Sequence, residues 1–184
     1  MYLILDIETA PLESLNSEGK PEDALSPITG RVIAIGMRWR DEERIIMDPN
    51  EKKMLSEFWS ELRAFSNSYP NFRLVGFNVI DFDMYFLINR SLHHNVKILR
   101  LGRNSFLDLR EHVTLFRPYR KGGSLIDYAR LIGVEGKYEA IEGRQIPGLW
   151  KEGRIEDIRA YLSSDLRITQ VLLEQCIGIG LIET

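Results

Sequence analysis

The chain opens with an apolar run, Tyr2 to Leu5, that is followed at once by two acids, Asp6 and Glu8. The run shows no polar alternation, which predicts a strand buried on both faces at the centre of a sheet. Side chains two residues apart on a strand lie on the same face, so the two carboxylates are expected to project together. Like charges side by side repel unless a cation lies between them. The pair therefore indicates a cation site, although a strand that simply ended in two solvated acids would show the same sequence.

The rest of the chain predicts further strands and helices around this first strand. Residues 31–39 and 44–47 are expected to form a hairpin, because only a short charged turn separates them. After a helix at residues 51–69, whose apolar positions recur at helical spacing, strands and helices alternate, which is typical of an α/β sheet. The expected order is a strand at 73–77, a helix at 82–92, a strand at 106–109 and helices at 124–132 and 155–175, with 11–30 and 134–153 irregular.

Length and composition predict one globular domain over residues 1–184, with 44% hydrophobic and 28% charged residues. No apolar run approaches the roughly 20 residues that a membrane-spanning helix needs. The single Cys176 forms no internal disulfide, and we expect it to be a packing residue in a protein of the reducing cytoplasm. A net charge of −3 argues only weakly against a nucleic-acid partner, because bound divalent cations reverse the local field.

A third acid lies in the last predicted helix. The apolar stripe of this helix consists of Ile158, Tyr161, Leu162, Leu166, Ile168 and Leu172. Asp165 falls inside the stripe, where an ionised carboxylate is costly unless it is paired or binds a metal. Tyr161, four residues earlier, lies one turn away on the same face. A position at the edge of the stripe, with a salt bridge to Arg167, would also explain this acid.

Residues 76–83 form the junction between a predicted strand and a predicted helix, and they contain Asp81 and Asp83. Functional sites in α/β sheets are built at the carboxyl ends of strands, so either acid is a candidate ligand. An acid in the first turn of a helix also interacts favourably with the helix dipole, and that role alone would explain either one.

Other common catalytic motifs are missing from the sequence. The histidines His93, His94 and His112 do not have a metal-ligand spacing such as H-E-x-x-H, and no Walker loop, G-x-G-x-x-G or G-x-S-x-G motif occurs. Oxygen ligands without sulfur or imidazole partners favour Mg²⁺ or Mn²⁺ over zinc. The acids therefore predict a site for a hard divalent cation.

Three segments, taken in order, resemble the motifs of the DEDD superfamily of 3′–5′ exonucleases, which have the ribonuclease H-like fold. They are Asp6-Ile7-Glu8-Thr9, Asn78-x-x-x-Phe82-Asp83 and Tyr161-x-x-x-Asp165. The tyrosine four residues before the last acid is the DEDDy pattern. The asparagine five residues before Asp83 resembles the proofreading domain of family B DNA polymerases. Because the chain ends about where such a domain ends, the resemblance implies a free-standing relative of it.

The resemblance also implies a fold and a set of roles. The expected fold is α/β, a mixed sheet with an antiparallel meander followed by alternating α and β elements, flanked by helices. Asp6, Glu8, Asp83 and Asp165 would bind two Mg²⁺ or Mn²⁺ ions about 3.5–4 Å apart. Asp6 would bridge both ions, Glu8 would help to orient the attacking water, Asp165 would complete the first ion site, and Asp83 would lie on the side of the second. Tyr161 would position the water, since a phenol with a pKa near 10 is mostly protonated at neutral pH.

The substrate implied by the resemblance is the 3′ end of a single-stranded nucleic acid, DNA rather than RNA, or the 3′ end of duplex DNA. Single-strand binding commonly stacks bases on aromatic or apolar side chains and holds phosphates with basic ones. Residues near the acids that are expected to contact the last nucleotides are Thr9, Leu12, Phe77 and Asn78. Residues suited to phosphates are Lys121, Lys137 and Arg144.

Two alternatives remain open beside DNA hydrolysis. A non-catalytic nucleic-acid-binding subunit with the same fold should have lost at least one ligand, whereas the four acids and Tyr161 are all present. An RNA-trimming 3′–5′ exoribonuclease is also consistent with the motifs, but no RNA-binding helical module is appended. Replication or repair proteins are the protein partners that the resemblance suggests.

Overall fold

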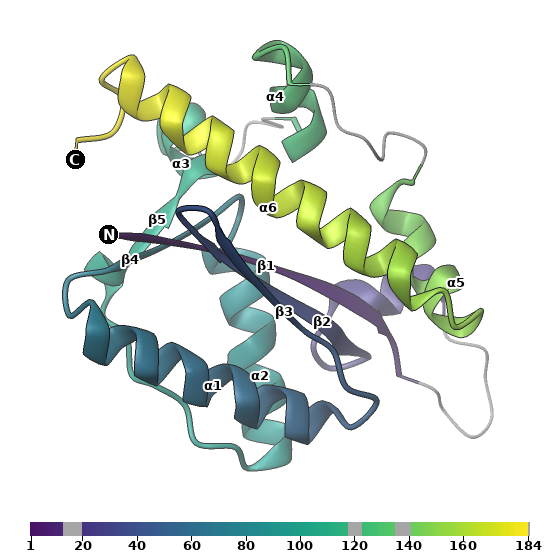
Figure 1. The fold of residues 1–184 in the computed structure, drawn as a ribbon. Coiled ribbons are helices and arrows are strands. Elements are labelled where there is room, and N and C mark those ends of the chain that lie inside the picture. The colour runs from purple at the N-terminus through teal and green to yellow at the C-terminus, as the bar shows by residue number, and fades with distance from the viewer. Residues whose placement is uncertain (13–19, 118–122, 135–140, 184) are drawn as a thin grey trace.

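The computed structural model describes residues 1–12, 20–117, 123–134 and 141–183 and contains a five-stranded mixed sheet (Figure 1). The strands are β1 (Tyr2–Pro11), β2 (Gly30–Trp39), β3 (Glu42–Ile46), β4 (Arg73–Gly76) and β5 (Phe106–Asp108), in the spatial order β3-β2-β1-β4-β5. β1, β2 and β3 pair antiparallel, whereas β4 and β5 run parallel to β1. The predicted meander followed by parallel strands is therefore confirmed, with β1 at the centre of the sheet.

β1 is longer than the apolar run that predicts it. Its pairing with β2 continues past Asp6 and Glu8 as far as Pro11, with a shift of register between Glu8 and Thr9. Both acids therefore lie within a strand that is paired with β2, just beyond the part that pairs with β4, and Glu8 is only 9% exposed. The alternative of a strand that ends in two solvated acids is wrong.

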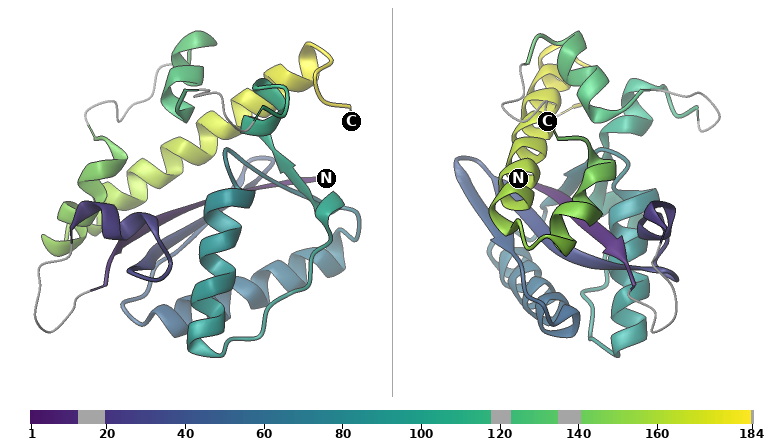
Figure 2. Two further views of the ribbon diagram at one scale, coloured as in Figure 1. Left: turned by 180° about the vertical axis from the view of Figure 1, so that it is seen from behind. Right: turned by 90° about the vertical axis from the view of Figure 1, so that its right-hand side faces the viewer.

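Helices cover both faces of the sheet (Figure 2). One face carries α1 (Glu51–Ser68) and α2 (Tyr85–His94), and the other carries α4 (Leu125–Leu131), α5 (Ile146–Lys151) and α6 (Ile155–Gly178). The short α3 (Leu109–Val113) follows β5 directly. Among the described residues, no helix is both long and apolar enough to cross a membrane.

Alternate side chains of β1 pack into two different hydrophobic cores. Leu3, Leu5 and Ile7 belong to the core under α1 and α2. Ile4 and Ala10 belong to the core under α6. Since side chains alternate between the faces of a strand, Asp6 and Glu8 occupy the two positions between Ile4 and Ala10 on the α6 face. The strand thus places both acids beneath the helix that carries Asp165.

Gly36 brings α6 close to the sheet at this point. It is the residue of β2 that pairs with Asp6. A Cβ atom on Gly36 would lie 2.7 Å from Cδ1 of Leu166 and 3.0 Å from Cγ of Leu162. The absence of a side chain on Gly36 therefore lets the helix lie directly on the sheet, beside Asp165.

Several expected boundaries were wrong. The predicted irregular stretch 11–30 contains the end of β1 and a 3-10 helix, η1 (Pro21–Leu25), and the stretch 134–153 contains a 3-10 turn, η4 (Gly143–Gln145), and α5. Pro147 suggested a loop, but a proline is tolerated in the first turn of a helix, where it lies here. The helix expected from Phe82 begins as a π-helical turn, η2 (Ile80–Met84), before α2 becomes regular at Tyr85.

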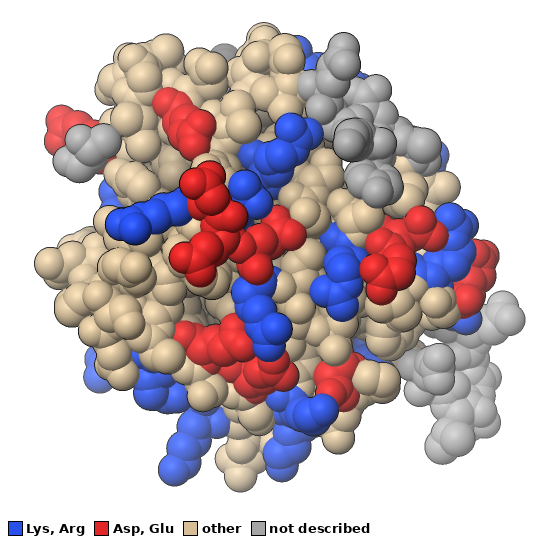
Figure 3. Space-filling model, viewed as in Figure 1, with Lys and Arg blue, Asp and Glu red and all other residues tan. Residues whose placement is uncertain are grey.

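The face of the molecule shown in Figure 3 carries acidic and basic side chains close together. On β3 and its neighbours these charges are paired. Arg38 bonds Glu43 at 3.1 Å, and Arg44 bonds both Glu57 and Glu61 of α1. These exposed pairs contribute little to stability, but they leave this edge of the sheet without a surplus of positive charge.

The substitution Gly36→Val tests the close approach of α6. The added methyl groups would collide with Leu162 and Leu166, so we expect the free energy of unfolding to fall by about 1–3 kcal/mol, the usual cost of overpacking. Urea unfolding followed by circular dichroism measures this change. Gly102→Val is the matched control, because a Cβ there meets nothing within 4 Å. Equal unfolding midpoints for the two variants would contradict the packing described here.

Candidate active site

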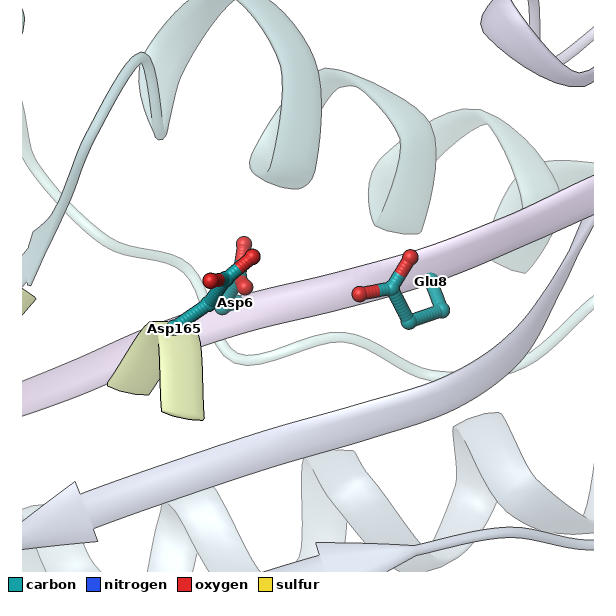
Figure 4. A group of neighbouring side chains, drawn as sticks. All are labelled: Asp6, Glu8 and Asp165. Carbon is teal, nitrogen blue, oxygen red and sulfur yellow. The ribbon is translucent and has the colours of Figure 1, made fainter. Parts of the chain in front are cut away.

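Three carboxylates from two elements converge on the α6 face of β1. Asp6 and Glu8 project from the same side of the strand, and Asp165 reaches toward them from α6 (Figure 4). One oxygen of each lies within 4.8 Å of the others, a spacing at which a single cation can be bound by all three. The residues that the sequence predicts as ligands from the first and last motifs are thus brought together.

Asp83 lies next to this cluster but is not one of its three members. Its side chain is 2% exposed, and its Oδ1 accepts a hydrogen bond from the backbone N–H of Ile7 at 3.0 Å. Ile7 separates Asp6 from Glu8 in the chain, so this bond holds the η2 turn against β1 at the site. Asp81, two residues earlier, is exposed, as expected for the acid that is not a ligand.

The pKa values of all four acids are raised, and burial is the largest cause for each. For Asp6, the charges of Asp83, Asp165 and Glu8 add to the effect, in that order. For Glu8, the charges of Asp165 and Asp83 do so. The pKa of Asp165 rises to about 7, against the lowering effect of a hydrogen bond from Tyr161. Without a cation, the site therefore disfavours the fully ionised state of these carboxyl groups.

Tyr161 is held as a hydrogen-bond donor. Burial raises the pKa of its phenol, and the charges of Asp165, Glu8 and Asp6 raise it further. The hydroxyl therefore stays protonated at neutral pH and donates a hydrogen bond to the Asp165 carboxylate. A Cβ atom on Gly143 of η4 would lie 3.6 Å from this hydroxyl oxygen, so η4 passes directly over it.

Asp108, which the sequence analysis missed, holds the second motif in place. It is 3% exposed and lies at the carboxyl end of β5. Its carboxylate accepts hydrogen bonds from the backbone N–H groups of Asn78 and Ile80, at 2.9 and 3.2 Å. Asn78 has a positive φ of 70° and needs such support, because non-glycine residues rarely adopt this conformation. The sequence did contain a sign of this role, because Asp108 follows the apolar residues Phe106 and Leu107. The same pattern, an acid after an apolar strand, pointed to Asp6.

Three residues that were predicted to contact the substrate have contacts within the protein itself. Thr9 is buried and donates its hydroxyl to the carbonyl of Ala24 at 2.7 Å, which ties η1 to β1. Leu12 lies just beyond β1, where its N–H bonds the carbonyl of Thr29. The ring of Phe77 packs against Tyr128 of α4, with centroids 5.5 Å apart. Lys121 and Lys137 lie outside the described residues.

Two pockets open beside the acids and meet at η4. The first, of about 430 Å³, lies between α4 and α6 and is lined by Tyr161 and Asp165. The second, of about 550 Å³, is lined by Glu8 and Thr9 together with the apolar side chains of Leu25 and Phe82. Gly143 and Arg144 line both of them. Arg144, which was expected to suit phosphates, is therefore the cation at the boundary between the pockets.

Residues 29–176 match a protein family described as predicted 3′–5′ exonucleases related to the exonuclease domain of PolB. The match covers well over half of the chain. The protein belongs to this family. The predicted resemblance to the exonuclease domain of family B DNA polymerases is thereby confirmed.

Relatives of this chain include proteins of similar and of much greater length. An uncharacterized protein of Methanocaldococcus jannaschii is 34% identical over 189 residues, which span 98% of this chain and 97% of that protein. A DNA polymerase of Archaeoglobus fulgidus is 26% identical over 178 residues, which span 89% of this chain and 22% of the polymerase.

A solved structure supports the fold. The family B DNA polymerase of the hyperthermophilic archaeon Pyrobaculum calidifontis matches with a TM-score of 0.73 and 21% identity, over 98% of this chain and 25% of the polymerase. At that identity the likeness concerns the fold alone, and it confirms the predicted ribonuclease H-like sheet with flanking helices. The chain corresponds to about a quarter of the length of either polymerase.

Exonuclease domains of this kind use divalent metal ions, and the carboxylate cluster fits such an ion in two respects. Asp6, Glu8 and Asp165 offer oxygen ligands at a suitable spacing. Burial raises the pKa values of all three acids, neighbouring carboxylates raise those of Asp6 and Glu8 further, and a cation would favour the ionised state of each.

The stability of the protein in EDTA should depend on Asp165. Its pKa rises from an ordinary value of 3.8 to about 7, so the folded chain keeps this proton to a higher pH than the unfolded chain. The resulting stabilisation is complete below pH 3.8 and is lost as the pH rises through about 7. We expect the free energy of unfolding of the wild type, measured in urea at a series of pH values, to fall over this range relative to that of Asp165→Asn.

A repeat of the titration with Mn²⁺ provides the control. An ion that binds the folded wild type would stabilise it by mass action, whereas the variant is short of one carboxylate. We therefore expect Mn²⁺ to raise the wild-type stability more than that of the variant at neutral pH. Parallel pH profiles in EDTA would contradict the raised pKa of Asp165 and the burial that causes it.

Proposed function

We propose that this protein is a metal-dependent 3′–5′ exonuclease that hydrolyses phosphodiester bonds from the 3′ end of single-stranded DNA. The observation that carries the proposal is the convergence of Asp6, Glu8 and Asp165 within 4.8 Å, beside the buried Asp83. Four carboxylates gathered around the middle of the central strand have no structural use that would offset their repulsion. They do suit a reaction in which cations stabilise charge on a phosphate.

Each acid has a role that its position supports. Asp6, Glu8 and Asp165 would hold one ion, and Asp6 and Asp83 would hold a second. Two divalent ions at such a site stabilise the attacking and leaving oxygens of the scissile phosphate. Asp83 keeps its position through the bond from Ile7, and a hydrogen bond between its carboxyl group and that of Asp6 places the two side chains together.

Tyr161 would orient the attacking water. Its raised pKa makes it a hydrogen-bond donor and an unsuitable general base. Glu8 faces the same site from β1 and would accept a hydrogen bond from that water. A donor and an acceptor on opposite sides fix a water molecule in one orientation, which is how positioning accelerates a hydrolysis.

The pockets on either side of Arg144 support attack at a chain end. The pocket beside Glu8 has the volume of a ligand pocket and an apolar lining from Leu25 and Phe82, which suits a terminal base and sugar. Arg144 stands where a phosphate between the two pockets would lie, and it is a strong phosphate ligand by its fork of N–H donors. DNA is the first choice of substrate because the longer relatives are DNA polymerases.

Hydrolysis of a labelled strand tests the proposal. We expect 5′-labelled single-stranded DNA in Mg²⁺ or Mn²⁺ to give a ladder that shortens from the 3′ end. Asp83→Asn should lower the rate by about 10²-fold or more, as expected when a group that stabilises charge in the transition state is removed. Asp81→Asn is the matched control, since this acid lies two residues away but is exposed, and it should retain the wild-type rate.

The same assay separates the alternatives. RNA and duplex DNA of the same sequence serve as competing substrates, and a faster ladder on RNA would replace DNA as the substrate. Equal rates for the wild type and Asp83→Asn would indicate a contaminating nuclease, and they would refute the proposal. Tight binding of DNA with no product in either metal would identify a binding subunit.

A substitution of Tyr161 tests its positioning role. Tyr161→Phe removes the hydroxyl and keeps the ring, so we expect kcat to fall by about 10²-fold, with KM for the strand nearly unchanged. Thermal unfolding serves as the control for stability, and both proteins should unfold within a few degrees of each other. A fall in kcat/KM that came from KM alone would assign Tyr161 to substrate binding instead.

A further inference from the structure

A third pocket, of about 510 Å³, lies along the outer edge of the sheet, and apart from Asn78 and Asp108 its residues have no part in the candidate active site. We call it the β5 groove. At one end it is lined by Asn78 and Asp108, at the carboxyl ends of β4 and β5. At the other it is lined by Arg73, where β4 begins, and by Arg103, just before β5. The groove therefore starts at the second motif and runs back along both strands.

Four arginines line the β5 groove, namely Arg73, Arg103, Arg110 and Arg117. In the part of the chain that the structure describes, none of them forms an ion pair. This differs from the β3 edge, where Arg38 and Arg44 are paired with glutamates. Unpaired guanidinium groups along a groove favour a ligand that carries several negative charges.

Arg73 has a guanidinium group whose hydrogen bonds are only partly satisfied. Its Nη2 donates to the carbonyl of Phe106 at 3.1 Å, but its Nε is buried and has no hydrogen-bond partner among the described residues. A buried donor without a partner destabilises the folded state. The acids of the groove do not satisfy it, and the Asp108 carboxylate is already occupied by backbone N–H groups.

An exposed aromatic ring stands beside these cations. Phe116 lines the groove and is 62% exposed, and its ring lies 5.0 Å from that of His112. Phe116 and Leu115 both have positive φ angles, of 56° and 54°. Bulky side chains in that conformation are strained, and such strain often marks a functional position. Here the strained turn holds a large apolar ring in solvent next to the arginines.

The β5 groove is connected to the acids through Asn78. Arg110 donates from Nη1 to Oδ1 of Asn78 at 3.0 Å, and the backbone N–H of Asn78 bonds Asp108. The chain from Asn78 leads within five residues to Asp83. A strand whose 3′ end lay at the acids could therefore continue past Asn78 into the groove.

We propose that the β5 groove binds the part of a single-stranded nucleic acid that lies upstream of the 3′ end, with the arginines on phosphates and Phe116 against a base. Cations that follow the backbone, together with a ring on which a base stacks, are the usual elements of single-strand binding. The proposal rests on the proposed function, because the position of the 3′ end defines the direction of the strand.

Binding and hydrolysis are measured separately to test the β5 groove. The double variant Arg103→Glu/Arg117→Glu changes two exposed groove residues and leaves Arg110 in contact with Asn78. In an Asp6→Asn background, which prevents hydrolysis, it is titrated against a fluorescent oligothymidylate of about 16 nucleotides. We expect binding at least about tenfold weaker. The slope of log K against log salt should also be reduced, by about 0.7 for each phosphate that the arginines no longer neutralise.

Hydrolysis of thymidine 5′-p-nitrophenyl phosphate provides the second measurement. This ester has no upstream strand, so the double variant with its native Asp6 should hydrolyse it at the wild-type rate. Arg40→Glu is the control with the same kind of charge change, because Arg40 lies in the exposed turn between β2 and β3, at the opposite edge of the sheet. It should change neither measurement.

The outcomes distinguish the two proposals. Unchanged oligothymidylate binding in the double variant refutes the β5 groove, whether or not the wild type is a nuclease. A wild type that hydrolyses neither the ester nor a DNA strand refutes the proposed function, while weakened binding would still establish the groove as a single-strand site. Equal weakening by Arg40→Glu would mean that net charge alone controls binding, which also refutes the groove.

Discussion

The mutual repulsion of buried carboxylates is the interaction on which the site depends. Asp6, Glu8 and Asp165 are held close together. The charge of Asp165 raises the pKa values of both Asp6 and Glu8, and the charge of Glu8 raises that of Asp6 further. A fold can maintain such an arrangement only when the elements that carry the acids are fixed by other contacts. Two hydrophobic cores, one on each face of β1, supply those contacts, and Gly36 lets α6 lie directly on the sheet. The packing of these cores therefore compensates for the unfavourable electrostatic energy of the acids, which a bound cation would reduce.

The four acids are not equivalent. Three of them form a compact group, whereas Asp83 has one oxygen bound to the N–H of Ile7. That bond fixes the orientation of Asp83, but it also reduces the number of oxygens that Asp83 can offer a cation. In the proposed mechanism, the protein therefore supplies more ligands to the ion at the three-acid group than to the ion on the Asp83 side. The ion on the Asp83 side needs more ligands from substrate and water, as is usual for Mg²⁺ beside phosphates.

Much of this arrangement could be predicted from the sequence, and the reasons are physical. The spacing of Asp6 and Glu8 fixes a common face on any strand, and the place of Asp165 in an apolar stripe reveals a buried charge. Tertiary contacts decided what could not be predicted. The π-helical turn before α2 and the support of Asn78 by Asp108 both depend on β5, which is far away in the sequence. The helix α5 was missed because Gly and Pro residues indicated a loop, whereas packing of Ile146 and Leu149 against α6 stabilises a short helix.

The net charge of −3 conceals how the charges are distributed. At the β3 edge, acids and bases neutralise one another, and at the centre of the site three acids stand together beside the buried Asp83. The arginines of the β5 groove carry no ion pair among the described residues, so their charges remain available to a ligand. In the proposed function a polyanion would be held by these arginines on one side, and by cations on the acids on the other. An acidic protein can bind a nucleic acid in this way because attraction depends on local charge and falls off within about 10 Å at ordinary ionic strength.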